Sequence, residues 1–183
     1  MNFNLQPILE NDLCVLSPLE EKDFDALYKV ASDPKIWEQH PNKDRWKKEV
    51  FENFFEGAMK SKGAFKIINK ETGEVVGSTR FYDFDQEDDS IFIGYTFYAV
   101  SCWGKGVNQS VKKTMLDYLF QYVSKVKFHI GAENIRSQIA ISRIGAEKVA
   151  EEEVAYFGEK PKLNFVYQID KEDWKREKPK HLV

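Results

Sequence analysis

Apolar and polar side chains alternate along four stretches of the first hundred residues, and this period of two is typical of β-strands. The alternation predicts strands at residues 13–18, 65–68, 75–84 and 91–100. A polar turn containing Gly73 joins the second of these strands to the third, and the polar residues 85–90 join the third to the fourth. We therefore expect three antiparallel strands side by side.

Apolar side chains three or four positions apart mark a second set of elements, because this spacing puts them on one face of a helix. It predicts helices at residues 20–32, 41–57, 107–123 and 134–144. Pro34 disfavours helix at the residue before it, and Gly57 and Gly145 are the expected ends of the second and fourth helices. Further strands are expected at residues 126–130, at Val149 with residues 154–157, and at residues 165–169.

The predicted helix at residues 107–123 lies between the strands at residues 91–100 and 126–130. A strand, a helix and a second strand in this order form a crossover, so the two strands should be parallel and the connection right-handed. The pattern therefore predicts a mixed α/β fold whose sheet is mostly antiparallel and contains one parallel pair.

No internal repeat, low-complexity tract or Pro/Ser-rich linker divides the chain, so we expect residues 1–183 to form a single domain. Its core should span about residues 13–170. The charged tail at residues 171–183 is expected to be either a short helix or disordered.

Charge and cysteine content exclude several classes of function. The chain has 27 Lys and Arg against 30 Asp and Glu, a net charge of -3, so nucleic acid is not an expected partner. Cys14 and Cys102 belong to no CxxC or Cys/His cluster, so we expect no bound metal and reduced thiols. The N-terminus lacks a basic start with an apolar core, and no later stretch approaches a membrane-spanning length. These features predict a soluble cytoplasmic protein that neither enters a membrane nor is exported.

The sequence Trp103-Gly104-Lys105-Gly106 lies between a predicted strand and the helix that begins at Val107. Glycines let the backbone approach a ligand closely, and the first N–H groups of a helix attract anions, so a pyrophosphate fits this loop. Two glycines are equally suited to a simple strand-to-helix turn. The loop matches neither GxxxxGK[ST] nor GxGxxG, because Gln109 stands where the second pattern requires glycine, which disfavours ATPase and dinucleotide-binding functions.

A second motif opens the helix at residues 134–144. Asn134 is suited to cap this helix, and Ser137 lies one turn further on, so both side chains are expected near the ends of the strands. Plain capping explains Asn134 equally well.

Together, WGKGVN, the long helix, the following strand and NIRSQIAISRIGA resemble the GNAT acetyltransferase superfamily, and within it the RimJ/RimL-like N-acetyltransferases. The resemblance covers residues 13–170 and is strongest over residues 91–146. It implies helices on both faces of the sheet and a parallel pair of strands that splay apart to hold acetyl-CoA, with no metal. The residues that it assigns to coenzyme A are Phe97, Tyr98, Trp103, Gly104, Lys105, Gly106, Val107, Asn108 and Asn134; Lys105 has the alternative of being a solvated lysine.

The resemblance also implies direct transfer of the acetyl group to an amine, with Ser137 near the thioester sulfur and Asn134 on the pantetheine arm as the catalytic candidates. The group that takes the amine proton stays open, since Phe92 stands where relatives often carry glutamate. Ordered water, His129 and an acid at a strand end, Asp83 or Asp85, are the alternatives. The glutamates at residues 151–153 are expected to be a solvated strand face.

The expected acceptor is a small-molecule amine or a protein N-terminus, bound near Arg80 and Tyr82 and the helix at residues 41–57. Arg80 suits a carboxylate or phosphate of the acceptor, or is simply a solvated strand arginine. Trp37, His40 and Trp46 either wall this pocket or only pack. Two alternative functions remain: an acyl-CoA-binding sensor or scaffold with little catalysis, and an unrelated α/β protein in which the glycine loop is only a turn. If the chain forms an oligomer, a homodimer is expected.

Overall fold

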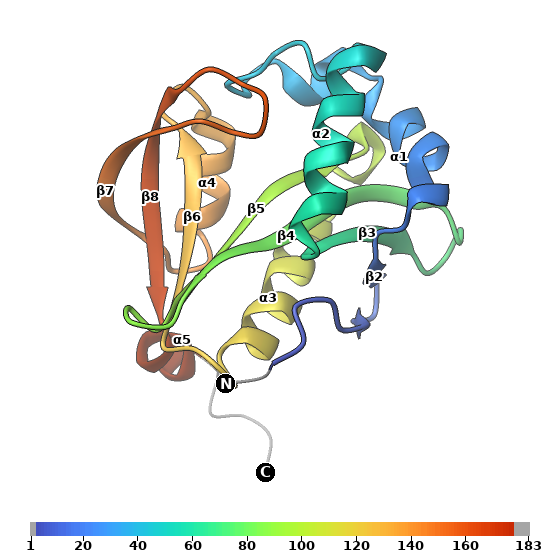
Figure 1. Cartoon of the computed structure of the whole chain (residues 1–183). Coiled ribbons are helices and arrows are strands. Elements are labelled where there is room, and N and C mark those ends of the chain that lie inside the picture. The colour runs from blue at the N-terminus through green and yellow to red at the C-terminus, as the bar shows by residue number, and fades with distance from the viewer. Residues whose placement is uncertain (1–2, 178–183) are drawn as a thin grey trace.

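A computed structural model describes residues 3–177 of the chain. Its eight strands form one sheet in the order β1-β2-β3-β4-β5-β6-β8-β7 (Figure 1). The strands are β1 (Leu9–Glu10), β2 (Cys14–Pro18), β3 (Ala64–Asn69), β4 (Val75–Asp85), β5 (Ser90–Tyr98), β6 (Lys125–Gly131), β7 (Glu147–Val154) and β8 (Lys162–Asp170). Only β5 and β6 pair in parallel, and every other neighbouring pair is antiparallel. The mixed sheet with one parallel pair is thus confirmed.

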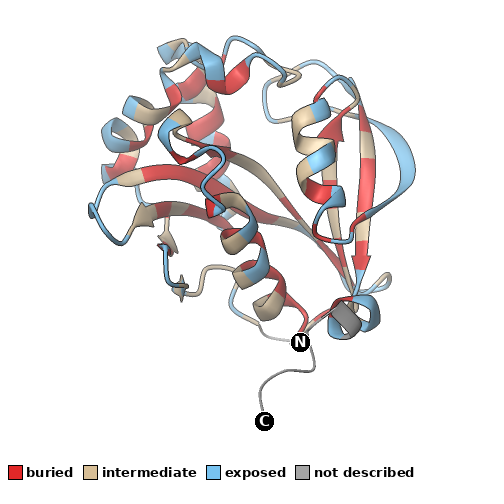
Figure 2. Ribbon diagram, turned by 180° about the vertical axis from the view of Figure 1, so that it is seen from behind, coloured by how far each residue is buried: buried red, intermediate tan, exposed pale blue. Residues whose placement is uncertain are grey.

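Helices cover both faces of this sheet. The α-helices are α1 (Phe24–Ala31), α2 (Lys48–Ser61), α3 (Val107–Leu119), α4 (Ile135–Ser142) and α5 (Lys171–Glu177), and the short 3-10 helices are η1 (Glu21–Asp23), η2 (Pro34–Trp37) and η3 (Val100–Cys102). Helices α1 and α2 lie on the face turned to the viewer in Figure 1, and α3 and α4 lie on the face seen in Figure 2. The sheet is therefore the middle layer of three. No helix within residues 3–177 is long and apolar enough to cross a membrane.

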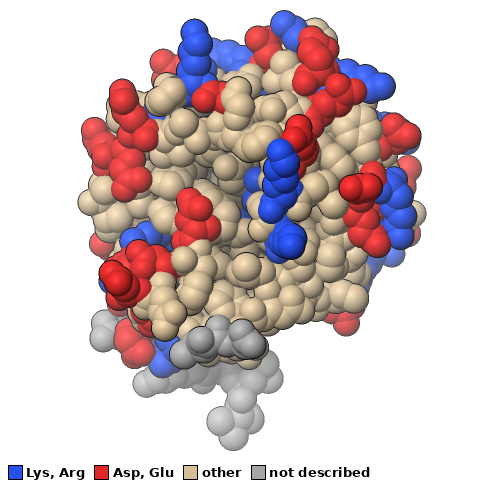
Figure 3. Space-filling view, in the orientation of Figure 1, with Lys and Arg blue, Asp and Glu red and all other residues tan. Residues whose placement is uncertain are grey.

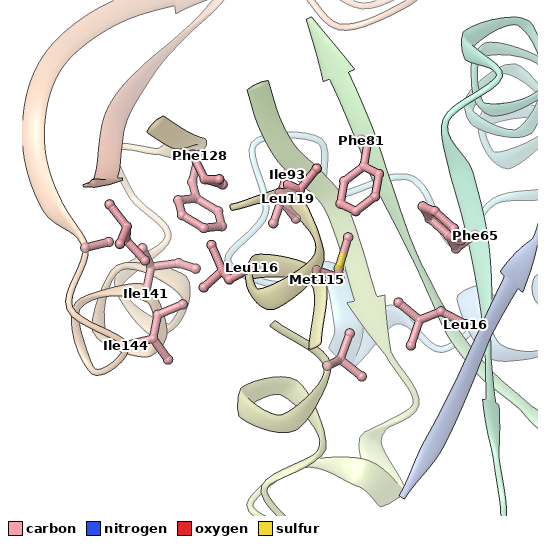
Figure 4. Packing of buried hydrophobic residues seen from close by; sticks show 14 of the residues in the cluster. Leu16, Phe65, Phe81, Ile93, Met115, Leu116, Leu119, Phe128, Ile141 and Ile144 are labelled. Carbon is pink, nitrogen blue, oxygen red and sulfur yellow. The ribbon is translucent and has the colours of Figure 1, made fainter. Parts of the chain in front are cut away.

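The larger hydrophobic core lies between the sheet and helices α3 and α4. Met115 and Leu116 of α3 are fully buried against strand residues that include Phe65 and Ile93, and Ile141 of α4 extends the same cluster (Figure 4). A second core packs α1 and α2 on the opposite face around residues such as Phe51 and Trp37. The central strands of the sheet are therefore covered by a hydrophobic core on each face.

The prediction of a helix at residues 41–57 is wrong at both ends, since α2 spans Lys48–Ser61. Asn42 and Asp44 explain the late start: the side chain of Asn42 accepts a hydrogen bond from the Asp44 N–H, which holds a turn in place of a helix. Gly57 lies inside the helix, where a Cβ would be 3.0 Å from the Cβ of Phe157, so the glycine allows that side chain to approach closely. The helix ends instead at Ser61, and its C-cap Lys62 has a φ of 50°.

Smaller corrections concern the other elements. The helix expected at residues 20–32 is a 3-10 turn followed by α1, α3 ends at Leu119 rather than at residue 123, and the strand expected to reach residue 157 ends at Val154. The tail forms α5 as far as Glu177, and residues 178–183 lie outside the described residues.

The exposed glutamates of β7 are confirmed as a solvated face, and acidic side chains gather on the left of the view in Figure 3.

Candidate active site

Strands β5 and β6 begin side by side and then separate. The parallel register joins Ser90 to Lys125 and ends where Phe92 pairs with Lys127. Beyond this point β5 stays with β4 and β6 stays with β8, so the facing edges of β5 and β6 have no strand partner. A cavity of about 530 Å³ opens between them, which is large enough for a cofactor-sized ligand.

A bulge in β5 shapes the wall of this cavity. Tyr95 has a φ of 53°, and the pairing of β4 with β5 skips a position between Ser78 and Arg80. Bulges turn a side chain out of the regular alternation and are frequent beside active sites. Here the bulge brings the ring of Tyr95 to the cavity.

The glycine loop lies at one end of the cavity. Gly104 and Gly106 have φ values of 72° and 75°, and apart from each glycine and its two chain neighbours no described atom lies within 4 Å of the position that a Cβ would take. Gly106 is also the N-cap of α3 and contributes no side-chain cap. The first N–H groups of α3 therefore have no partner inside the helix and lie at the lining formed by Val107 and Asn108. This open cradle of N–H groups fits a pyrophosphate.

Two arginines that the sequence analysis did not single out line the cavity, and one of them lies at the glycine loop. The guanidinium carbon of Arg136 is 4.1 Å from the centroid of the Trp103 ring, and the group donates a hydrogen bond to the carbonyl of Ile36 at 3.2 Å. Arg143 also lines the cavity. Arg136 is therefore a cation that can approach a phosphate bound at the glycine loop.

Helix α4 brings Asn134 and Ser137 to the cavity. The Oδ1 atom of Asn134 accepts a hydrogen bond from the Ser137 N–H at 3.2 Å, as expected for an N-cap. Both residues belong to the cavity lining, between the glycine loop and the splayed strands.

Aromatic residues wall the other end of the cavity: Trp37, His40, Tyr82, Tyr95 and Tyr156. Arg45 lies among them and is only 2% exposed. Its guanidinium donates two hydrogen bonds to Glu159 Oε1, from Nε at 3.0 Å and from Nη2 at 2.8 Å, and its carbon lies 4.9 Å from the centroid of Phe54. The single carboxylate of Glu159 neutralises this buried cation.

The cavity between the splayed strands, with the glycine loop at one end, is the arrangement that the GNAT resemblance implies. The family model for the acetyltransferase (GNAT) domain matches residues 14–147. The chain belongs to the GNAT acetyltransferase family. The fold implied by the resemblance is thereby confirmed.

Similar proteins agree with this GNAT assignment. The chain is 31% identical over 86 residues to an uncharacterized N-acetyltransferase, p20, of Bacillus licheniformis; the match covers 46% of this chain and 48% of the relative, about half of its length. A GCN5-related N-acetyltransferase from Brucella melitensis has the same fold, with a TM-score of 0.76, 17% identity and coverage of 93% of this chain and 81% of that one. Mycobacterium smegmatis RimJ, solved in complex with CoA-disulfide, gives a TM-score of 0.65 at 18% identity over 87% of this chain and 83% of that one.

Most of the residues assigned to coenzyme A in this GNAT chain line the cavity. The lining includes Phe97, Tyr98, Trp103, Gly104, Gly106, Val107, Asn108 and Asn134. Lys105 is exposed and lies outside the lining, which agrees with its alternative as a solvated lysine. The roles of the others stay predictions, now supported by their common location.

The two residues expected to bind the acceptor differ in position. Tyr82 lines the cavity, whereas Arg80 is 4% exposed and lies behind Tyr95, with its guanidinium carbon 3.8 Å from that ring centroid. The expectation of a solvated Arg80 is therefore wrong, and burial lowers its pKa to about 10. Trp37 and His40 line the cavity, but Trp46 does not.

The side chains proposed as the proton acceptor also differ in their distance from the cavity, because only one of them lines it. Asp83 and Asp85 lie outside the cavity lining, and Asp85 instead accepts backbone hydrogen bonds in the turn after β4. His129 lies on β6 in the lining, and burial lowers its pKa below the ordinary value. Of the three side chains proposed from the sequence, only the imidazole is at the cavity.

Lys112 of α3 is a cavity residue that the sequence did not reveal, since its position on the helix face depends on how α3 docks. It is 3% exposed and donates a hydrogen bond to Thr96 Oγ1 at 2.7 Å. Burial lowers the pKa of Lys112 to about 7, because the charged form loses its hydration. The spacing of the apolar residues around Lys112 predicts the helix, but it does not indicate that this lysine is buried.

Proposed function

We propose that this protein transfers the acetyl group of acetyl-CoA directly to a primary amine, on a small molecule or at a protein N-terminus. One observation carries the proposal: a single cavity joins the open N–H cradle of the glycine loop to the aromatic end, passing between the splayed strands. Such a cavity accommodates a phosphate-bearing donor and an acceptor at opposite ends, with their reacting groups meeting in the middle.

The donor end supplies binding and orientation. The N–H groups that open α3 hold the pyrophosphate, with Arg136 near it beside Trp103. The free edge of β5 near Phe97 and Tyr98 offers backbone hydrogen bonds to the amide-containing pantetheine arm, and Asn134 faces the same space from α4. The smegmatis RimJ structure, which contains CoA-disulfide, agrees with coenzyme A as the donor.

The chemistry requires three contributions from the chain. A neutral amine forms a bond to the thioester carbon, the C–S bond breaks, and the thiolate leaves. Backbone N–H groups of β5 near Tyr98 stabilise the oxyanion, and the Ser137 hydroxyl donates a proton or a hydrogen bond to the departing sulfur. The remaining contribution is removal of the proton of the amine.

The experiment that tests the proposal is thiol release from acetyl-CoA with a panel of amines. The panel contains a free amino acid, a polyamine and a peptide with a free N-terminus, and the same peptide with a blocked N-terminus is the matched control. Thiol release that depends on one acceptor supports the proposal. Calorimetric binding of coenzyme A without thiol release for any amine contradicts it and favours the sensor or scaffold instead.

A further inference from the structure

A chain of three polar side chains runs from the aromatic end of the cavity to the protein surface. The Oη atom of Tyr82 lies 3.1 Å from Nδ1 of His129, and Nε2 of the same imidazole lies 3.2 Å from Oε2 of Glu152. Tyr82 and His129 line the cavity, and the side chain of Glu152 is 52% exposed. The three residues come from β4, β6 and β7, so only the folded sheet brings them together.

From this geometry we infer that Tyr82, His129 and Glu152 form the relay that removes the proton of the acceptor amine. This inference rests on the proposed function. Tyr82 meets the amine, His129 accepts the proton behind it, and Glu152 is the positioning residue.

The hydrogen bonds of His129 determine which of its ring nitrogens donates and which accepts. A carboxylate at Nε2 favours the tautomer that carries the hydrogen on Nε2, which leaves Nδ1 as an acceptor for the Tyr82 hydroxyl. When the N–H bond of the ammonium breaks, its proton binds Tyr82 Oη while the phenolic proton moves to His129 Nδ1. Tyr82 stays a neutral phenol before and after the step, and the positive charge ends on the imidazolium beside the Glu152 carboxylate. Glu152 keeps its negative charge and holds the imidazolium until the product leaves; the Nδ1 proton then passes back through Tyr82 to water in the open cavity, which restores the starting tautomer.

The environment of His129 suits this role. Tyr82 and Asp83 face it from β4, Lys127 from its own strand, and Glu152 from β7. Burial is the largest effect on the imidazole and lowers its pKa, so the ring is neutral at pH 7 and able to accept a proton. Burial also holds the pKa of Tyr82 well above its ordinary value, so the hydroxyl keeps its proton until His129 takes it.

Glycine at position 94 makes the placement of Tyr82 possible. A Cβ there would lie 2.8 Å from Cε1 and 2.9 Å from Oη of Tyr82. The phenol therefore lies directly over β5 just past the point where β5 and β6 stop pairing. This is the region in which the amine has to meet the donor.

The other basic side chains at the cavity are less suited to the step. His40 Nε2 lies 3.2 Å from Nη1 of Arg45, which is always a donor, so the acceptor atom of that ring is already occupied. The ammonium of Lys112 donates hydrogen bonds to the hydroxyls of Thr96 and Thr79, and its neighbours on α3, such as Val111 and Met115, belong to the hydrophobic core. Of the two imidazoles that line this cavity in residues 3–177, only His129 is bonded to a carboxylate, and the side chain of that carboxylate is half-exposed.

The test measures kcat and KM against pH for the best acceptor of the amine panel. In the wild type, kcat/KM should rise as the imidazole loses its proton, with a midpoint below the ordinary histidine pKa. His129→Gln should lower kcat at pH 7 by about 100-fold, change the KM for acetyl-CoA little, and lose this rising limb. Tyr82→Phe should lower kcat without moving the limb, because the imidazole still titrates.

Glu152→Gln is the variant that separates positioning from structure. The carboxylate raises the pKa of His129, so its removal should shift the rising limb to lower pH and reduce kcat by about tenfold. The matched control is Glu153→Gln on the same strand, which should leave the limb and kcat unchanged. Because Glu152 is at the surface, this variant tests the relay even if His129→Gln does not fold.

The outcomes distinguish the relay from the proposed function. An active wild type whose rising limb survives in His129→Gln, or stays in place in Glu152→Gln, overturns the relay and leaves acetyl transfer standing. A wild type that releases no thiol with any amine overturns both.

Discussion

The rings of Phe92 and His129 stack face to face, with their centroids 4.1 Å apart and an angle of 17° between their planes. Phe92 is the last residue of β5 that pairs with β6, and His129 lies two residues past the end of that pairing. The ring of Phe92 thus packs against an imidazole that lines the cavity.

This stack leads to the first prediction. Phe92→Leu should lower kcat several-fold and reduce the free energy of unfolding by about 1 kcal/mol, since an aromatic pair is worth up to about that much beyond its buried area. Phe92→Tyr keeps the ring and is the control. Steady-state kinetics and urea denaturation measure the two effects, and equal kcat in both variants would show that the stack does not orient His129.

A second prediction concerns the glycine loop. Gly104→Val should weaken coenzyme A binding at least tenfold, because a side chain would fill the open space next to the N–H groups of α3. Gly73→Val is the matched control: Gly73 has a φ of 71° and open space around it, but it lies in the turn between β3 and β4. Both variants should lose about 1–2 kcal/mol of stability from backbone strain. Calorimetry that gives the same affinity for both variants contradicts the placement of the pyrophosphate.

The third prediction tests the role assigned to the hydroxyl on α4. Ser137→Ala should lower kcat by about 10- to 100-fold and leave the KM for acetyl-CoA nearly unchanged, because the hydroxyl interacts with the sulfur mainly as the thiolate forms. Ser142→Ala at the exposed end of α4 is the control. Full turnover in Ser137→Ala would remove Ser137 as the proton donor.

The buried ion pair at the aromatic end gives a fourth prediction. Glu159→Gln should destabilise the protein by about 3 kcal/mol, since Arg45 would stay buried with its charge unbalanced. Glu56→Gln breaks an exposed pair with Lys60 and should change stability by less than about 0.5 kcal/mol. Chemical denaturation of the two variants measures the difference. A small effect of Glu159→Gln would mean that Arg45 is hydrated.

Lys112 makes stability depend on pH. Its pKa is lowered to about 7 in the folded protein, so between pH 7 and its ordinary value near 10.5 the unfolded chain binds a proton that the folded protein does not. The free energy of unfolding should therefore rise with pH in this window by up to about 1.4 kcal/mol per unit. Lys112→Met should be more stable than the wild type at pH 6, and this advantage should shrink toward pH 10. Urea denaturation at several pH values measures it.

The exposed neighbour provides the control for this fifth prediction. Lys113→Met should change stability little and equally at every pH, because the side chain of Lys113 is 62% exposed. If Lys112→Met follows the same course as Lys113→Met, then Lys112 is charged and hydrated in the folded protein.

The sequence by itself determined the fold class, the parallel crossover and the location of the glycine loop. Each of these depends on neighbours in the chain: alternation and helical spacing fix the elements, and the order of elements fixes the handedness. Asn134 as an N-cap is also a local property, because its side chain bonds to the N–H three residues later. The ends of α2 were predicted less well: a turn held by Asn42 and Asp44 delays its start, and the helix passes through Gly57 and ends at Ser61, before the left-handed Lys62.

Only the tertiary structure decided which polar side chains meet. Tyr82, His129 and Glu152 are up to 70 residues apart and join because β4, β6 and β7 each present one residue at the same end of the sheet. Arg80 is buried although its strand position suggested solvent, since the bulge at Tyr95 places a ring over it. The pattern of the chain determines the backbone through local interactions, but burial and the resulting pKa shifts depend on the elements that pack around each side chain.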